Sequence, residues 1–441
     1  MKKVSKEVIV SLLLFVMVLS LVACQGTNTP SDATTGSNVV VTTAQEKITL
    51  DFPSWQATEP GFADFWVKLI EDFKAKHPNV TINLYQVPYS GYVDTLVTRF
   101  SSNTPPDICH IPTAFFDAFY GQGWFDTLDD RFATTDILKK WTPLQSTMQR
   151  EGKNYGLLLM GYGYSMFYNE KIFSDANVDV PTDMESFVAA ARALTKDTNN
   201  DGNIDQFGWG TCSITSPSLY YGVSALLIGN GSHWTKGDTT ELNFDDPLLL
   251  DAVATYKSMY SEKLIPMGLS IEQMRSFFFE GKIGMIFDGP WVYAMKSTAP
   301  AELQDSFKIA RVPFKRVVGA ASNSMHIPVI LEDSKKDLVW DFISQITTDE
   351  YQVQYAKLTN STPPKSGILT DEFIGEYPQF KFFTEAAAEA VNNVTAGYQS
   401  VHTEFSKIIV DGMVDMVTNN LTPETALKKI EETIKRDIDL P

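Results

Sequence analysis

Residues 48–86 have the sequence ITLDFPSWQATEPGFADFWVKLIEDFKAKHPNVTINLYQ, which contains two strand patterns with a helix pattern between them. Apolar and polar residues alternate over 48–52 and again over 80–85, as in strands that bury one face. The intervening apolar residues recur at helical spacing: Phe65, Trp66, Leu69, Ile70 and Phe73. The pattern stops before Pro78, because the residue that precedes a proline avoids helical backbone angles. A strand, a helix and a strand in this order predict a parallel sheet.

Similar patterns continue along the chain. A helix pattern around residues 92–100 and a strand pattern at 107–111 predict one more strand in this parallel sheet. A second α/β series begins near residue 155, and helix patterns dominate the last hundred residues. Because single cores rarely grow beyond roughly 250–300 residues, the 441 residues predict two lobes. Gly161 and Gly163 lie where the chain would leave the first lobe, and they suit either a hinge or a β-bulge.

The start of the chain indicates export. Residues 1–23 combine a lysine-containing start with an apolar run that is shorter than the roughly 20 residues of a membrane span. The run ends in Leu-Val-Ala-Cys, which resembles the lipobox of bacterial lipoproteins, whose cysteine, here Cys24, is diacylated. The alternative is an ordinary signal peptide followed by a chance cysteine. Residues 24–46 are polar and small, which predicts a flexible tether. We therefore expect an extracytoplasmic protein that is lipid-anchored to a bacterial membrane through Cys24.

Charge and motifs exclude several function classes. The formal net charge is −18, whereas nucleic-acid binding needs clustered Lys and Arg, so we expect no nucleic-acid partner. The sequence contains no His-Glu-x-x-His, Gly-x-Ser-x-Gly or P-loop signature, and its five histidines lack metal-like spacing. We therefore expect no catalytic residues and no enzyme activity.

One segment follows a metal motif. Residues 197–205, DTNNDGNID, match the start of a calcium loop, in which alternate oxygen side chains face the ion. The candidate ligands are Asp197, Asn199, Asp201, Asn203 and Asp205. The twelfth loop position is Gly208, so the bidentate glutamate of an EF-hand is missing. The sequence predicts a structural Ca²⁺, with an Asx-rich solvated turn as the alternative.

Aromatic residues near strand ends and loops form another signal. Trp55, Tyr162, Trp291 and Tyr398 are among them. A pyranose has apolar C–H faces and polar edges, so a sugar site combines flat side chains with carboxylates and amides. Any one of these aromatic residues equally suits a core or a lid.

Six short motifs occur in the order and spacing of a known family. They are the 65–77 helix before Pro78 and a strand, TPPDI (104–108), FYN (167–169), FEGKIGM (279–285), GPW (289–291) and TPETAL (422–427). With the lipobox, they resemble the extracellular solute-binding proteins of ABC importers, in the sugar-binding branch that includes maltose-binding protein. The resemblance covers the chain from about Ile48 to the C-terminus. It implies a two-lobed α/β fold, periplasmic-binding-protein-like and of type II, with a hinge that the chain crosses three times.

The resemblance also implies a division of the chain. The lobes would be an N-terminal lobe of residues 47–160 plus 322–362 and a C-terminal lobe of residues 165–318 plus 366–441. The crossings would lie near 161–165, 319–322 and 362–366. Cys109 and Cys212 would then lie in different lobes, where a disulfide would oppose lobe closure, so we expect free thiols.

The implied function is capture of a sugar or oligosaccharide between the lobes and its delivery to an ABC permease, by a monomeric lipoprotein. The expected cleft residues are Trp55, Gln56, Glu59, His110, Thr113, Tyr162, Tyr220, Asp288, Trp291, Asn323 and Tyr398. Trp291 matches a tryptophan that stacks on sugar in this branch, and Asp288 and Glu59 would accept sugar hydroxyls. The charged residues that hold maltose in this branch have no counterparts here, so the resemblance implies a sugar without naming it. The alternatives are an anchored carbohydrate-active lyase or hydrolase, and an adhesin or scaffold.

Overall fold

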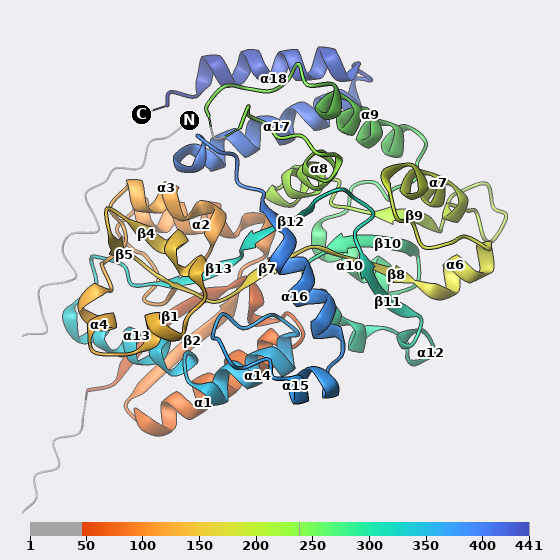
Figure 1. The fold of residues 1–441 in the computed structure, drawn as a ribbon. Coiled ribbons are helices and arrows are strands. Elements are labelled where there is room, and N and C mark those ends of the chain that lie inside the picture. The colour runs from red at the N-terminus through yellow and green to blue at the C-terminus, as the bar shows by residue number, and fades with distance from the viewer. Residues whose placement is uncertain (1–45, 238, 441) are drawn as a thin grey trace, which may run out of the picture. The chain divides into compact units, whose positions relative to one another are not determined.

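The computed structural model describes residues 46–237 and 239–440 (Figure 1). The predicted signal, Cys24 and all of the predicted tether except Glu46 lie outside the described residues. None of the described helices has the length and apolar character that a membrane crossing requires.

The opening βαβ unit is present as predicted. β1 (Ile48–Ser54) and β2 (Val80–Gln86) are parallel, with Ile48 opposite Val80, and α1 (Phe62–Lys76) connects them. The helix buries Phe65, Trp66, Leu69 and Phe73 and ends at Lys76, with His77 as its C-cap directly before the proline. The predicted extension of this sheet was wrong. β3 (Cys109–Pro112) pairs antiparallel with β13 (Asn323–His326), and only one backbone hydrogen bond, Ile108 N to Asp51 O at 3.0 Å, ties its start to β1.

The first part of the protein is completed by the sheet β3-β13-β6, with β6 at Leu157–Leu158. The remaining elements of this part are α2 (Tyr89–Ser101), α3 (Phe116–Gly121), α4 (Asp129–Ala133), α5 (Ile137–Lys140), β4 (Gln149–Arg150), β5 (Lys153–Asn154), α13 (Asp333–Ile346) and α14 (Asp349–Thr359). The 3-10 turns η1 (Trp55–Ala57), η2 (Thr113–Phe115) and η3 (Pro143–Met148) also belong here.

The second part is built on a four-stranded sheet of order β11-β8-β10-β9. Its strands are β8 (Ser165–Asn169), β9 (Phe207–Gly210), β10 (Ile283–Asp288) and β11 (Phe307–Arg311). Its helices are α6 (Glu170–Ala176), α7 (Met184–Leu194), α8 (Pro217–Asn230), α9 (Pro247–Ser261), α10 (Ile271–Phe279), α11 (Val292–Met295), α12 (Ala301–Gln304), α15 (Asp371–Glu376), α16 (Gln379–Glu389), α17 (His402–Thr418) and α18 (Pro423–Asp437). The turns η4 (Lys296–Thr298) and η5 (Gln399–Val401) complete the set. The C-terminal helices α17 and α18 pack with α8 and α9 (Figure 1).

A third sheet, β14-β12-β7, contains two of the predicted hinge crossings. β7 (Gly161–Gly163) runs antiparallel to β12 (Val317–Ala321), and β14 (Ala390–Asn392) flanks β12. Gly163 is explained by close packing, because a Cβ at this position would lie 2.1 Å from the backbone oxygen of Ala386 in α16. The third predicted crossing instead contacts the end of α5, where Thr142 N donates to Pro364 O. That these three segments act as a hinge stays a prediction.

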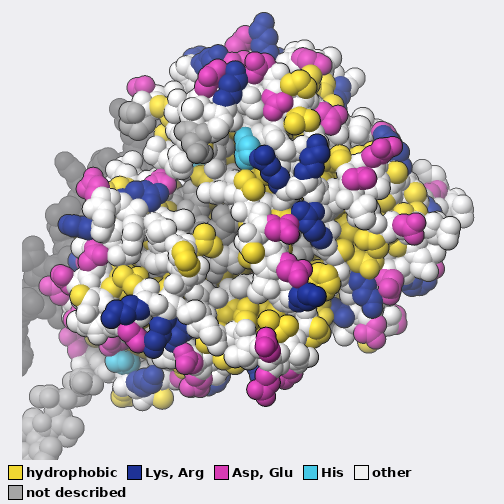
Figure 2. All heavy atoms as spheres, viewed as in Figure 1, with side chains coloured by type: hydrophobic (Ala, Val, Ile, Leu, Met, Phe, Trp, Pro, Cys, Tyr) yellow, Lys and Arg dark blue, Asp and Glu magenta, His cyan; other side chains and the backbone are white. Residues whose placement is uncertain are grey.

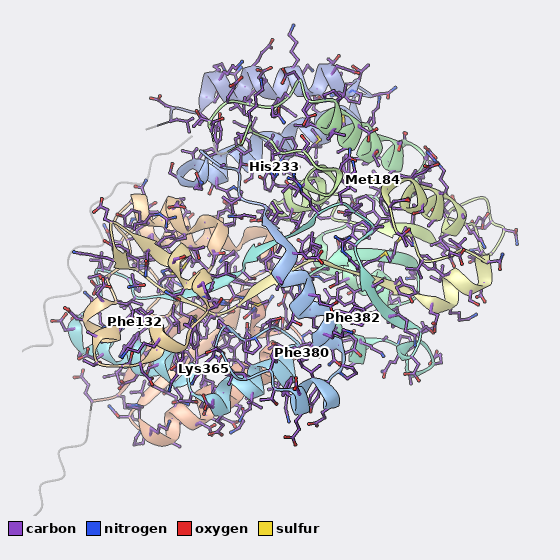
Figure 3. The ribbon with its side chains drawn as sticks, in the orientation of Figure 1. Phe132, Met184, His233, Lys365, Phe380 and Phe382 are labelled. Carbon is purple, nitrogen blue, oxygen red and sulfur yellow. The ribbon has the colours of Figure 1, made fainter. Side chains whose placement is uncertain are left out.

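The two parts have separate hydrophobic cores. One core consists of residues between 50 and 162 and between 325 and 355, and the largest core of the other part spans residues between 166 and 434. On α16, Phe380 is buried in the second part while Phe382 is exposed (Figure 3). Cys109 and Cys212 are buried free thiols, as predicted. The limits of the two lobes stay predictions.

Candidate ligand-binding cavity

One cavity is lined by elements of both α/β parts. The empty space in it, counted together with its open mouth, is about 1010 Å³. The first part contributes η1, the start of α2 and the ends of β3 and β13, and the second contributes β9, α8, α10 and β10. These are strand ends and helix faces, so the side chains that enter the cavity are held by regular structure.

The cavity wall is rich in aromatic rings. Tyr162 of β7 meets Trp291 at 5.0 Å between ring centroids, and Trp55 of η1 meets Tyr89 at 5.6 Å. Tyr164 and Tyr221 add two more rings to the lining. Flat, rigid rings of this kind offer large contact area to the apolar faces of a ligand.

The position of Trp291 depends on the glycine two residues before it. β10 ends at Asp288, and the indole of Trp291 folds back over Gly289. A Cβ on Gly289 would lie 2.1 Å from indole atom Cη2, so no residue with a side chain fits there without moving the ring. The indole is partly buried and packs against the cores of both parts, rather than being sealed in one of them. The Gly-Pro-Trp sequence therefore places a ring at the cavity wall.

Three charged side chains meet in the same wall. Arg275 Nε donates to Asp288 Oδ2 at 2.8 Å and its Nη2 donates to Asp288 Oδ1 at 3.0 Å, which makes a bidentate pair. The third nitrogen, Nη1, lies 3.7 Å from Glu59 Oε1 of the other part. Burial raises the pKa of Glu59 to about 7, although Arg275 opposes this shift. A protonated Glu59 can donate a hydrogen bond as well as accept one.

A buried donor of the lining has no partner. Trp209 is 1% exposed, and its Nε1 finds no hydrogen-bond acceptor among the described residues. Leaving such a donor unsatisfied costs about 1–3 kcal/mol. Because Trp209 lines the cavity, a hydroxyl oxygen of a ligand is a suitable acceptor.

Seven of the predicted cleft residues line this cavity: Trp55, Gln56, Glu59, Tyr162, Asp288, Trp291 and Asn323. The structure thus brings residues from distant parts of the sequence into one wall. Their contact with a ligand stays a prediction.

The other four predicted residues lie outside the lining. His110 is buried behind Trp55, whose ring stacks on it at 4.2 Å, and burial lowers the pKa of His110 to about 3. Thr113 donates to Ser322 O at 3.2 Å, beside the lining residues Pro112 and Ala114. These two positions belong to the supporting structure rather than to the wall.

Tyr220 and Tyr398 are buried in the second part. The Tyr220 hydroxyl is 2.7 Å from Thr395 Oγ1, and the Tyr398 hydroxyl donates to Thr240 O at 3.1 Å. On α8 the adjacent residue, Tyr221, faces the cavity instead. A one-residue step turns a helix by about 100°, so the prediction of Tyr220 identified the helix that lines the cavity but not the side chain.

Arg275 is a charged residue of the cavity wall that the sequence patterns did not reveal. It lies in α10, which begins with a capping box between Ser270 and Gln273. Its neighbours Met274, Phe278 and Phe279 are buried, and Arg275 is itself only 8% exposed. A buried charged residue needs a partner of opposite charge. The arginine among the apolar residues of this helix was therefore the feature of the sequence that could have revealed a buried ion pair.

The predicted calcium loop forms a series of turns. Asp197 Oδ2 accepts from Gly202 N at 2.7 Å, and Asp201 Oδ1 accepts from Asn203 N at 2.8 Å. Asp205 accepts from the backbone and the hydroxyl of Thr198. Among the described residues, no three His, Cys, Asp or Glu side chains are placed as a metal site requires. The loop as placed matches the Asx-turn alternative, and calcium binding stays a prediction.

Comparison with known proteins assigns the chain to a family. The family model "Bacterial extracellular solute-binding protein" matches residues 58–353. The chain belongs to this family. This membership favours solute binding over the enzyme alternative, and it agrees with the extracytoplasmic location expected from the sequence.

Other solute-binding proteins share the sequence and the fold. A binding protein of Brucella abortus (strain 2308) is 25% identical over 299 residues, which cover 65% of this chain and 69% of that protein. Among solved structures, a solute-binding protein of Thermotoga lettingae TMO bound to α-D-tagatose is 18% identical, with a TM-score of 0.78 over 89% of this chain and 99% of that one. The GacH receptor of Streptomyces glaucescens, solved with acarbose, is 19% identical, with a TM-score of 0.76 over 89% of this chain and 100% of that one. The two-lobed fold is therefore that of solute-binding proteins.

Proposed function

We propose that the protein captures a sugar or oligosaccharide in the cavity between its two parts and delivers it to an ABC permease. The observation that carries the proposal is the wall itself, in which Trp55, Tyr162 and Trp291 surround carboxylates and a buried, unpartnered indole N–H. Rings suit the faces of a pyranose, and the polar groups suit its hydroxyls.

The cavity is lined by both α/β parts, which is the arrangement that binding and release of an unaltered ligand needs. A ligand that contacts both parts binds best when the parts are close together, so it favours the closed arrangement. The ligand differs between members with this fold, since tagatose and acarbose occupy two of the solved relatives. Those ligands support the class of sugars and oligosaccharides without naming the one bound here.

The enzyme alternative would need either a free carboxylate pair or a tyrosine or lysine base that converges on the cavity. Glu59 and Asp288 both line the cavity, but Asp288 accepts from Arg275 on both of its oxygens. A carboxylate held in this way is a poor nucleophile or base, and the pair therefore supports binding.

A thermal-shift screen against neutral mono- and oligosaccharides tests the proposal. A ligand that binds only the folded protein raises its melting temperature, and we expect at least one saccharide to do so. The same mixtures are then assayed for new reducing ends. No shift with any saccharide would contradict the proposal, and new reducing ends would favour the enzyme alternative.

We further propose that the protein is monomeric and works at the outer face of a bacterial membrane, with Cys24 as its lipid anchor. The support is the lipobox-like sequence before Cys24 and the polar segment after it. On the visible face, acidic and basic side chains are interspersed, and no basic patch stands out there for nucleic acid (Figure 2).

A further inference from the structure

The charges in the cavity wall are unbalanced. Among the described residues that line the cavity, Arg275 is the only Lys or Arg, and it faces the carboxylates Glu59 and Asp288. This imbalance limits which ligands fit.

Two sides of the Arg275 guanidinium each face a carboxylate of this wall. A guanidinium binds a carboxylate or phosphate best through two parallel N–H groups. Asp288 already takes Nε and Nη2, at 2.8 and 3.0 Å, and Asp288 Oδ1 also accepts from Gly289 N at 2.8 Å. The remaining nitrogen faces Glu59 at 3.7 Å. A ligand anion would therefore either have to displace Asp288 from two hydrogen bonds or approach Nη1 beside the carboxylate of Glu59.

Glu59 adds an anion that is only loosely paired. Its side chain is 20% exposed, and its distance of 3.7 Å from Arg275 exceeds a hydrogen bond. When ionised, Glu59 leaves one negative charge in excess in a dehydrated wall. A second anion placed there is repelled, since charges interact strongly where water is excluded.

We propose that this cavity rejects anionic sugars: Asp288 and Glu59 occupy the one cation of the described lining, so uncharged saccharides bind while carboxylated or phosphorylated ones do not. The inference rests on the proposed function and adds to it the charge class of the ligand. Glu59 and Asp288 act as specificity-determining residues.

The rejection depends on pH through Glu59. The charged and titratable groups around it are Arg275 and Glu272 of α10, Asp288 of β10, Tyr89 of α2 and Tyr355 of α14. Burial and the two carboxylates raise the pKa of Glu59 to about 7. Lowering the pH from 8 to 5.5 therefore neutralises Glu59, while a sugar carboxylate with a pKa of about 3.5 stays ionised. The preference for neutral over carboxylated sugars should therefore weaken as the pH falls from 8 to 5.5.

The test uses matched pairs of probes. Maltotriose, cellotriose and triacetylchitotriose are each compared with the same trisaccharide oxidised to the carboxylate at C6, by calorimetric titration at pH 8 and 5.5. For a neutral probe that binds, we expect its carboxylated form to bind about 100-fold more weakly at pH 8 and about tenfold more weakly at pH 5.5, because like charges in a dry interface repel strongly.

Two variants isolate the cause. In Glu59→Gln, the difference in affinity between the neutral and the carboxylated probe should fall to about tenfold at pH 8 and should no longer depend on pH. The reason is that the amide carries no charge to repel the carboxylated probe. Glu280→Gln is the matched control, since Glu280 directly follows the same helix, pairs with Lys282 on the surface and does not line the cavity, and it should keep the wild-type difference in affinity.

Three results would contradict the inference. Carboxylated and neutral probes of equal affinity at pH 8 would overturn it and leave saccharide binding intact. The inference would also be overturned if Glu59→Gln showed the same difference in affinity between neutral and carboxylated probes as the wild type. If no saccharide in the thermal-shift screen binds, the proposed function fails, and the inference fails with it.

Discussion

At the residue scale, Trp291 is one of the aromatic side chains that line the proposed binding surface. The sequence predicted its role from Gly-Pro-Trp, and the structure explains the glycine by the indole that covers it. The replacement Trp291→Ala should weaken saccharide binding by about 2–4 kcal/mol, as for a hot spot in a well-packed pocket. Calorimetry measures this change. Trp124→Ala is the matched control, because Trp124 stacks on Phe100 away from the cavity. A loss below about 0.5 kcal/mol for Trp291→Ala would count against the assignment.

His402 is a buried residue whose polar atoms are unsatisfied. Neither ring nitrogen has a partner among the described residues, and the ring packs against Phe115 at 5.5 Å and Tyr220 at 5.3 Å. Burial lowers the pKa of His402 to about 4. Because the folded-state pKa lies below the unfolded value of about 6.5, this group makes the protein less stable as the pH falls from 6.5 to 4.

The replacement His402→Phe should therefore stabilise the protein, and more so in acid. We expect a gain of about 1–2 kcal/mol in the free energy of unfolding at pH 7 and about 2 kcal/mol more at pH 5. Denaturant titrations at both pH values provide the measurement. His77→Phe, at a partly exposed histidine, is the control. An equal effect of His402→Phe at pH 7 and pH 5 would show that the histidine does not titrate as described.

Residue identity in the cavity was predictable only in part. Trp55, Tyr162 and Trp291 were predicted because they lie near strand ends or loops, and Trp291 also because it matches a sugar-stacking tryptophan of the family that the sequence resembles. Arg275 was missed because its ion pair with Asp288 joins a helix to a strand 13 residues further on. Tyr220 was chosen over Tyr221 because sequence spacing does not fix the rotation of a helix.

At the element scale, the local patterns predicted helices and strands but not their pairing. The βαβ unit of β1, α1 and β2 was predictable from the spacing of its apolar residues. They recur about every two residues in the strands and about every 3.6 residues in the helix. β3 pairs with β13, more than 200 residues away, and no local pattern contains that information.

The approach of α16 to β7 gives a prediction at this scale. Gly163→Ala would place a Cβ 2.1 Å from a backbone oxygen of α16, so the helix must move. We expect a loss of about 1–3 kcal/mol in the free energy of unfolding, as for other overpacked sites. Gly91→Ala in α2 is the matched control, since nothing lies within 4 Å of the position that its Cβ would take, and it should be neutral or slightly stabilising. Equal stability of the Gly163→Ala variant and the wild type would contradict the close packing.

The 197–205 loop gives a second prediction. If the sequence motif binds Ca²⁺, millimolar calcium raises the melting temperature above its value in EGTA, because the ion binds only the folded loop. Asp201→Asn should reduce that shift. Identical melting temperatures in calcium and EGTA would leave the hydrogen-bonded turns as the complete account of this loop.

At the scale of the whole molecule, the sequence predicted two α/β parts because the chain is too long for one core. It also predicted free thiols, since Cys109 and Cys212 belong to different parts. The lobe limits and the hinge could not be fixed from the sequence, because they depend on which glycines permit close packing and which permit motion.

Anchoring is also a property of the whole molecule. We expect the replacement Cys24→Ser to move the protein from the membrane fraction to the soluble fraction of a bacterial host, because a serine cannot carry the diacyl group. Detergent phase partitioning of both forms measures this. Wild-type protein in the aqueous phase would contradict lipidation.

A crystal structure with a saccharide from the thermal-shift screen tests the central claim most directly. The account predicts sugar density between the two parts, with one ring against Trp291 and a hydroxyl oxygen within hydrogen-bond distance of Trp209 Nε1. Sugar density only on the outer surface, with the cavity empty, would contradict it.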